Sequence, residues 1–168
     1  MKQAEQGGEF ALRIIKIDGG DFRGSGFVVN HDRIDRKYLI LTNTHVVKGR
    51  KSLTLKTKAG KLIGQAEVII RNKDIHSHYA DLALLEIDES QVEKNLGEKL
   101  LPIPMLSEFP QGQIATLVSG HNGTVSTGRL FRVRNMAFLL GGEAHPGDSG
   151  APYLVKIGEE YFFYAVSA

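Results

Sequence analysis

The sequence contains no cysteine. A disulfide framework, a zinc site built on thiolates and a cysteine nucleophile are therefore excluded. The absence of cysteine does not identify a cellular compartment, because many secreted proteins of bacteria and viruses also lack it.

Long apolar runs are also missing. Residues 1–10 are polar and contain glycine, and neither a signal peptide nor a stretch of 18 apolar residues is visible. We therefore expect no membrane segment and leave the localisation unknown. A signal peptide removed ahead of residue 1 would make the protein secreted or periplasmic.

Neither sign of charge dominates, because 21 basic and 19 acidic side chains give a net charge of +2. This balance predicts no nucleic-acid partner and no polybasic membrane patch. Apolar residues make up 42% of the chain and charged residues 24%, as in soluble globular proteins. The 168 residues suffice for one core or for two small cores that share a cleft.

Helical periodicity is scarce, and only 89–99 could form a turn or two of helix. Alternation of apolar and polar residues dominates instead, with glycine turns and a polar loop at 31–36 between the runs. Many short strands predict an all-β barrel or sandwich. The expected strands cover 11–17, 25–30, 37–42, 52–58, 61–71, 81–87, 113–119, 123–134, 136–140, 151–157 and 161–167.

Pro102, Pro104 and Pro110 mark an irregular connection between two sets of strands. We place the boundary between two barrels at this connection. The predicted units are an N-terminal β-barrel at 10–95, an interbarrel connection at 96–112 and a C-terminal β-barrel at 113–168.

Ser149 stands between glycines in the run Gly147-Asp148-Ser149-Gly150. A serine nucleophile needs a tight turn, a neutral imidazole that takes its proton, a carboxylate that orients the imidazole, and N–H groups that face the oxyanion. This run supplies the turn, and Pro146 fixes one backbone angle before it. Taken alone, the run is weak evidence for catalysis, and an ordinary type I or II turn is the favoured interpretation.

His45 and Asp81 supply the other two side chains. His45 follows a β-rich run at 39–42, and Asp81 opens the apolar run 81–87. Each could be structural by itself, the histidine as a satisfied polar residue and the aspartate as a turn cap. The order His, Asp, Ser within these three segments favours a catalytic triad of His45, Asp81 and Ser149.

Together these segments resemble the trypsin-like, chymotrypsin-fold serine proteases, and most closely the protease domain of the high-temperature-requirement branch. The resemblance runs from about residue 22 to residue 168. One departure is Asp148, where that branch usually has asparagine before the nucleophile. The matching motifs are GSGFVV at 24–29, ILTNTHVV at 40–47, DLALL at 81–85, PGDSGAP at 146–152 and the connection LPIPMLS at 101–107.

The resemblance implies a serine endopeptidase that cleaves protein or peptide substrates through an acyl-enzyme, without cofactor or metal. His45 would act as general base and then acid, Asp81 would orient it, and Ser149 would be the nucleophile. The N–H groups of Gly147 and Ser149 would form the oxyanion hole.

Two further residues would bind substrate in this resemblance. The main chain at Ser167 would pair with the substrate backbone. Glu143, six residues before Ser149, would lie at the base of the pocket for the side chain preceding the scissile bond. A carboxylate there favours Arg or Lys slightly over small aliphatic side chains.

The family fold implied is two packed antiparallel β-barrels of the six-stranded type. The second strand set has only five expected strands, so its barrel is short by its last strand. An open strand edge invites pairing. We therefore expect the edge of 161–167 to be covered by the N-terminal segment, by another subunit in an oligomer, or by residues beyond Ala168.

Three alternatives remain open at this point. The chain could be a catalytically silent double barrel that serves as a binding module, or a viral polyprotein-processing protease within the enzyme class. A metal site could also be built from His76, Ser77, His78 and Asp81, although a polar loop ahead of the 81–87 strand is the favoured interpretation of that segment.

Overall fold

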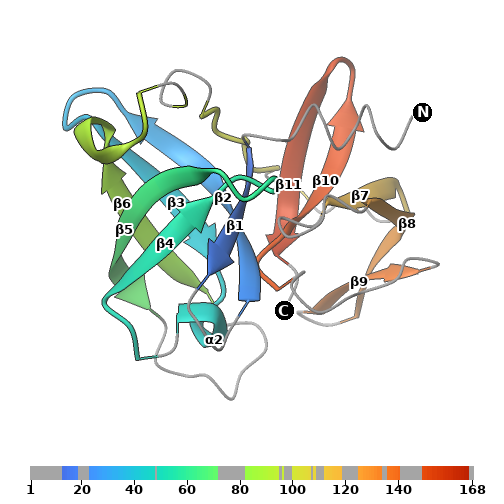
Figure 1. Ribbon diagram of the computed structural model, residues 1–168. Coiled ribbons are helices and arrows are strands. Elements are labelled where there is room, and N and C mark those ends of the chain that lie inside the picture. The colour runs from blue at the N-terminus through green and yellow to red at the C-terminus, as the bar shows by residue number, and fades with distance from the viewer. Residues whose placement is uncertain are drawn as a thin grey trace.

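The computed structural model is almost entirely β-structure (Figure 1). It describes residues 13–18, 23–47, 49–71, 82–94, 96, 100–106, 108, 112–118, 125–133, 136–140 and 149–166. The elements are β1 Ile14–Asp18, β2 Arg23–Asp32, β3 Lys37–Thr42, α2 Thr44–Val47, β4 Ser52–Lys56, β5 Leu62–Arg71, β6 Ala83–Asp88, the 3-10 helix η1 Glu89–Gln91, β7 Ile114–Val118, β8 Val125–Val133, β9 Met136–Leu140, β10 Pro152–Ile157 and β11 Glu160–Val166.

The first six strands close into an antiparallel barrel in the order β1-β2-β3-β6-β5-β4. Alternate residues of its strands point inward, and β6 shows the pattern plainly, because Ala83, Leu85 and Ile87 are buried while their neighbours are half-buried. This period-two burial is the alternation seen in the sequence. It gives the barrel a closed core of aliphatic side chains.

The remaining strands form a five-stranded antiparallel sheet in the order β11-β10-β7-β8-β9. Figure 1 places this sheet beside the barrel, with β10 and β11 next to β1 and β2. The expected fold class is confirmed: an all-β chain with a closed six-stranded barrel and a partial second one of five strands.

An apolar core joins the barrel to the second sheet. Phe27 on β2 is fully buried there, and its ring meets the edge of Phe163 on β11, with ring centroids 4.7 Å apart. Ile103 of the connection adds a buried side chain and donates its N–H to the carbonyl of Val28 at 2.9 Å. β2 is therefore buried on both faces, which explains why its residues 24–28 form an unbroken buried run.

Phe27→Ala should be one of the most destabilising single changes in the chain. Truncating a fully buried phenylalanine typically costs about 3–5 kcal/mol of unfolding free energy, because transfer and cavity terms add. Denaturant unfolding followed by two probes measures this cost. Ile34→Ala is the matched control, because Ile34 is 93% exposed and its loss should change stability by less than about 0.5 kcal/mol. Equal stability of the two variants would contradict the placement of Phe27.

Three local expectations need correction. The polar loop expected at 31–36 is shorter, because β2 continues through Asp32 and His31 pairs with Tyr38. The His31 ring stacks on Tyr38 and contacts the Glu89 carboxylate, which keeps the strand regular there. Among the described residues of 89–99, which are 89–94 and 96, helix occurs only at η1, and the short helix α2 was not expected at all.

The connection between the barrels covers part of the β11 edge. Met105 and Phe163 form a parallel bridge, in which Phe163 donates its N–H to the carbonyl of Pro104 and Leu106 donates to the carbonyl of Phe163. This cover differs from the three that the sequence suggested. Cover of the rest of the edge by the N-terminal segment, by another subunit or by residues beyond Ala168 stays a prediction.

The turn between β2 and β3 is held by the Asp32 carboxylate, which accepts N–H bonds from Ile34 at 3.0 Å and Asp35 at 3.1 Å. The backbone hydrogen bond from Asp35 lowers the pKa of Asp32, and the bond from Ile34 adds to this effect. Nearby, the hydrogen bond and charge of Glu86 raise the pKa of Lys37. These contacts fix the end of the barrel at which β3 begins.

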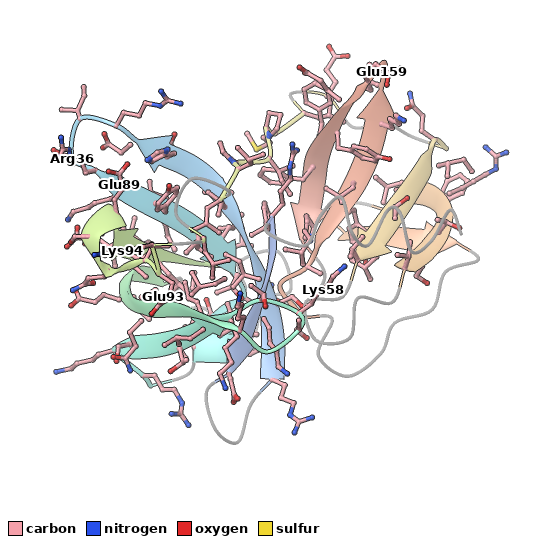
Figure 2. All side chains as sticks on the ribbon, turned by 45° about the horizontal axis from the view of Figure 1, so that its top comes forward. Arg36, Lys58, Glu89, Glu93, Lys94 and Glu159 are labelled. Carbon is pink, nitrogen blue, oxygen red and sulfur yellow. The ribbon has the colours of Figure 1, made fainter. Side chains whose placement is uncertain are left out.

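Charged side chains surround this end of the barrel. Figure 2 shows Arg36, Glu89, Glu93 and Lys94 on the side of the barrel away from the second sheet, and Glu159 at the tip of the β10–β11 hairpin. Among the described residues, no helix is long and apolar enough to cross a membrane.

Candidate active site

His45 lies on α2, the single turn of helix that follows β3. Its neighbours Val46 and Val47 are buried in the barrel core, whereas His45 itself is half-buried. Thr44, on its other side, donates its hydroxyl to the carbonyl of Leu82 at 2.8 Å. This bond ties the start of α2 to the residue that follows Asp81 in the sequence.

Ser149 is half-buried, and Gly150 after it is fully enclosed. Gly150 has φ +92°, a conformation that side-chain-bearing residues rarely adopt. A Cβ at this position would overlap the carbonyl oxygen of Ser25 and lie 2.5 Å from Oγ1 of Thr42. Only glycine fits here, and the Ser149–Gly150 turn is therefore packed directly on β2 and the end of β3.

Gly24 connects the two candidate catalytic segments. A Cβ on Gly24 would lie 2.6 Å from both γ-carbons of Val46 and 3.1 Å from the carbonyl oxygen of Ser149. The N–H of Ser25 donates to that same Ser149 oxygen at 2.6 Å. The residue after His45 and the backbone of Ser149 therefore both lie against Gly24.

The other predicted site residues cannot be placed. Asp81, Gly147, Glu143 and Ser167 lie outside the described residues, and so do His76, Ser77 and His78 of the metal alternative. Within the described part of the chain, no group of three or more His, Asp and Glu side chains could hold a metal ion.

The sequence pointed to His45 and Ser149 but not to the residues that hold them together. Ser25 and Thr42 are fully buried polar residues at the junction, and Thr44 is nearly so. The motifs at 24–29 and 40–47 contain all three, but nothing in the motifs distinguishes them from ordinary strand residues. Their roles depend on contacts between strands that the sequence alone does not display.

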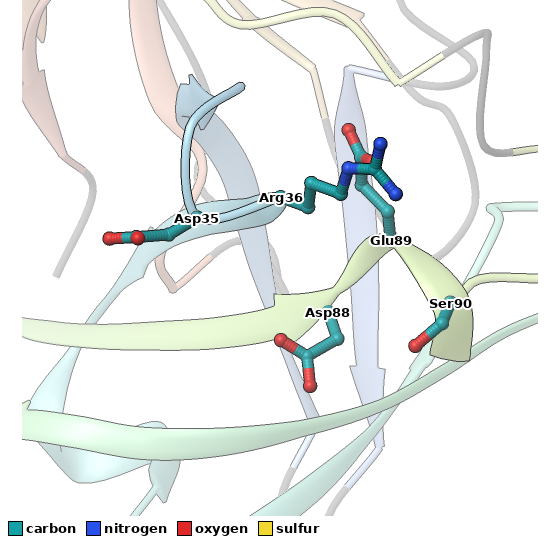
Figure 3. Close-up of a pocket in the computed structure, with 5 residues that line it drawn as sticks. All are labelled: Asp35, Arg36, Asp88, Glu89 and Ser90. Atoms are coloured by element: carbon teal, nitrogen blue, oxygen red, sulfur yellow. The ribbon is translucent and has the colours of Figure 1, made fainter.

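A charged cavity of about 520 Å³ lies away from this junction and is lined by Asp35, Arg36, Asp88, Glu89 and Ser90. In Figure 3 the Arg36 guanidinium lies beside Glu89, while Asp35 points away from it.

The pairing of β3 with β6 separates the cavity from the junction. Lys37 pairs with Asp88 at the cavity end, and Thr42 pairs with Ala83 at the His45 end. Five strand steps separate these ends, or about 17 Å. The cavity therefore does not belong to the candidate site.

The family model for the trypsin-like peptidase domain matches residues 24–159. The chain belongs to the trypsin-like peptidase family. Both segments of the junction, with His45 and Ser149, fall inside the matched region. The resemblance to trypsin-like serine proteases that the motifs indicated is thus confirmed.

Relatives of this trypsin-like protease include a Bacillus subtilis (strain 168) protein named serine protease Do-like HtrB, which is 30% identical over 153 residues. That match covers 80% of this chain, and the chain spans only 31% of the relative's length. The match to this relative agrees with the resemblance to the high-temperature-requirement branch that the motifs indicated.

Solved structures share the fold. A human pathogenic astrovirus serine protease superposes with a TM-score of 0.64 at 18% identity, over 92% of this chain and 80% of that one. A Yersinia pestis serine endoprotease gives a TM-score of 0.59 at 20% identity, over 95% of this chain and 54% of that one. At such identities these likenesses establish the double-barrel architecture alone.

Proposed function

We propose that the protein is a serine endopeptidase that hydrolyses peptide bonds with Ser149 as nucleophile, His45 as general base and then acid, and Asp81 as the residue that orients His45. The observation that carries this proposal is the junction at Gly24, where the backbone of Ser149 and the helix of His45 are packed against one strand. The bond from Thr44 to the carbonyl of Leu82, the residue that follows Asp81 in the sequence, supports the inclusion of Asp81.

The chemistry follows from these positions. His45 removes the proton of the Ser149 hydroxyl as it attacks the scissile carbonyl, and then gives that proton to the leaving amine. Water, deprotonated by the same imidazole, hydrolyses the acyl-enzyme and releases Ser149. Ser149 and His45 are both half-buried, whereas Gly150, which follows the serine, is buried.

The negative charge on the tetrahedral intermediate needs donors that are in place before the reaction. In this proposal the N–H groups of Gly147 and Ser149 supply them. The Ser149 carbonyl already accepts the Ser25 N–H, and this bond restrains the rotation of the peptide on the C-terminal side of Ser149. The N-terminal barrel, 10–95, thus provides base and acid, and the C-terminal barrel, 113–168, provides the nucleophile and substrate contacts such as Ser167.

We propose that Glu143 sets specificity for Arg or Lys before the scissile bond, through charge-assisted hydrogen bonds at the pocket base. Glu143→Ala should lower kcat/KM for Arg and Lys substrates by about 10- to 10²-fold, because such a bond contributes about 1.5–3 kcal/mol. Turnover of Val or Ala substrates should change little.

A digest of a peptide library randomised at four positions before the scissile bond measures this specificity for both proteins. Wild-type cleavage after Val or Ala, with Arg and Lys ignored, would overturn the role of Glu143 and leave the proposed triad standing. The same digest tests the enzyme proposal against a silent binding module, because a silent double barrel would leave the whole library uncut.

A further inference from the structure

The segment Thr42-Asn43-Thr44 precedes His45 and carries two buried hydroxyl groups that point to different parts of the fold. Thr42 is fully buried and donates its hydroxyl to the carbonyl of Ser25 at 2.8 Å. Thr44 is 4% exposed and donates its hydroxyl to the carbonyl of Leu82. A buried hydroxyl is retained at low cost only when it is hydrogen-bonded, and both of these are.

Thr42 acts on the nucleophile side. The Ser25 carbonyl that it binds lies directly beneath Gly150, and the N–H of the same Ser25 holds the Ser149 carbonyl. Thr42 Oγ1 itself forms part of the surface against which Gly150 packs. Removing this hydroxyl would leave a buried carbonyl without that donor and loosen the strand on which the Ser149 turn lies.

Thr44 acts on the other side. Leu82 is the first described residue after Asp81, and β6 begins at Ala83, which pairs with Thr42. The Thr44 hydroxyl therefore fastens the entry of β6 to the start of α2, one residue before His45.

We propose that Thr42 and Thr44 are positioning residues for the triad: Thr42 holds the turn of Ser149, and Thr44 holds Leu82, the residue that follows Asp81 in the sequence, against the helix of His45. This inference rests on the proposed function and adds residues to it. Thr42 donates its hydroxyl to the carbonyl of Ser25, and Thr44 donates its hydroxyl to the carbonyl of Leu82. Both act through backbone carbonyls of neighbouring segments.

The test compares Thr42→Val and Thr44→Val, which preserve shape and remove the hydroxyl, with Thr42→Ser and Thr44→Ser, which keep it. We expect each valine variant to lower kcat by about tenfold with KM within about twofold, because misplacement of reacting groups lowers turnover rather than binding. Each serine variant should return kcat to within about twofold of the wild type.

Thr57→Val is the matched control for the loss of a buried hydroxyl. Thr57 is 7% exposed, and its Oγ1 accepts the Lys61 N–H in the β4–β5 turn, at the end of β4 away from α2. This variant should lose about as much thermal stability as Thr42→Val and Thr44→Val, and it should keep the wild-type kcat. A kcat for either valine variant as high as that of Thr57→Val would overturn the inference for that residue.

Amide hydrogen exchange separates this inference from the proposed function, because it needs no turnover. The Ser25 N–H should exchange at least about tenfold faster in Thr42→Val than in the wild type or Thr57→Val, because the bond to Ser149 opens more often. Unchanged exchange would overturn the role of Thr42. A wild-type protein that cuts no peptide would overturn the proposed function, and the exchange rates would still decide whether Thr42 holds the Ser149 turn.

Discussion

Ser149→Ala should lower kcat by about 10⁶-fold and leave the folded structure intact. The hydroxyl is the attacking atom in the proposed mechanism, whereas the packing at this turn comes from the backbone of Ser149 and from Gly150. The measurement is kcat on the best peptide from the library, together with the thermal midpoint of both proteins.

His45→Ala supplies the internal comparison. Because nucleophile and base act as a unit, His45→Ala should lower kcat about as much as Ser149→Ala does. The double variant should have a kcat no lower than that of either single variant. Near-normal turnover by Ser149→Ala protein, with contaminating protease excluded by titration of active sites, would refute the triad.

Gly150→Ala should lower kcat/KM by about 10²-fold or more and also destabilise the fold. The new methyl group would overlap the Ser25 carbonyl oxygen, and something must move for it to fit. The shift falls on the turn of Ser149, and a misplacement of about 1 Å at a reacting group costs on the order of 10²-fold. Enzyme kinetics and denaturant unfolding of the same preparation measure both effects.

Gly60→Ala is the matched control for this change. Gly60 has φ +88°, close to the +92° of Gly150, but nothing lies within 4 Å of the position that its Cβ would occupy. Both variants therefore carry the backbone cost of a positive φ, about 1–3 kcal/mol, and only Gly150→Ala carries the overlap. If Gly60→Ala lost as much activity as Gly150→Ala, the effect would come from stability and not from the position of Ser149.

The strand pattern could be predicted from the sequence because burial in this fold repeats every second residue. The expected strands 37–42 and 136–140 agree with β3 and β9 residue for residue. The predicted strand ends were wrong where contacts with a neighbouring strand decide how far a strand runs. β2 runs on to Asp32 because His31 stacks on Tyr38, which lies on the next strand.

The sequence pointed to the candidate catalytic residues His45 and Ser149. It did not point to the buried residues that hold their segments in place. His45 and Ser149 are conspicuous because few residue types perform acyl transfer. Thr42 and Ser25 carry no such signal, because a threonine or serine in a β-run is as typical of a strand as of a buried hydrogen bond. Their importance depends on Gly24 and Gly150 bringing three segments into contact.

Labelling with a serine-reactive fluorophosphonate tests directly whether Ser149 is the nucleophile. The reagent modifies a serine whose hydroxyl is activated by a neighbouring base, so mass spectrometry of the digested adduct identifies the nucleophile. We expect one equivalent of label per chain, on Ser149, and strong suppression of that label in His45→Ala. A peptide-cleaving protein that is labelled on another serine, or on none, would contradict the assignment of Ser149.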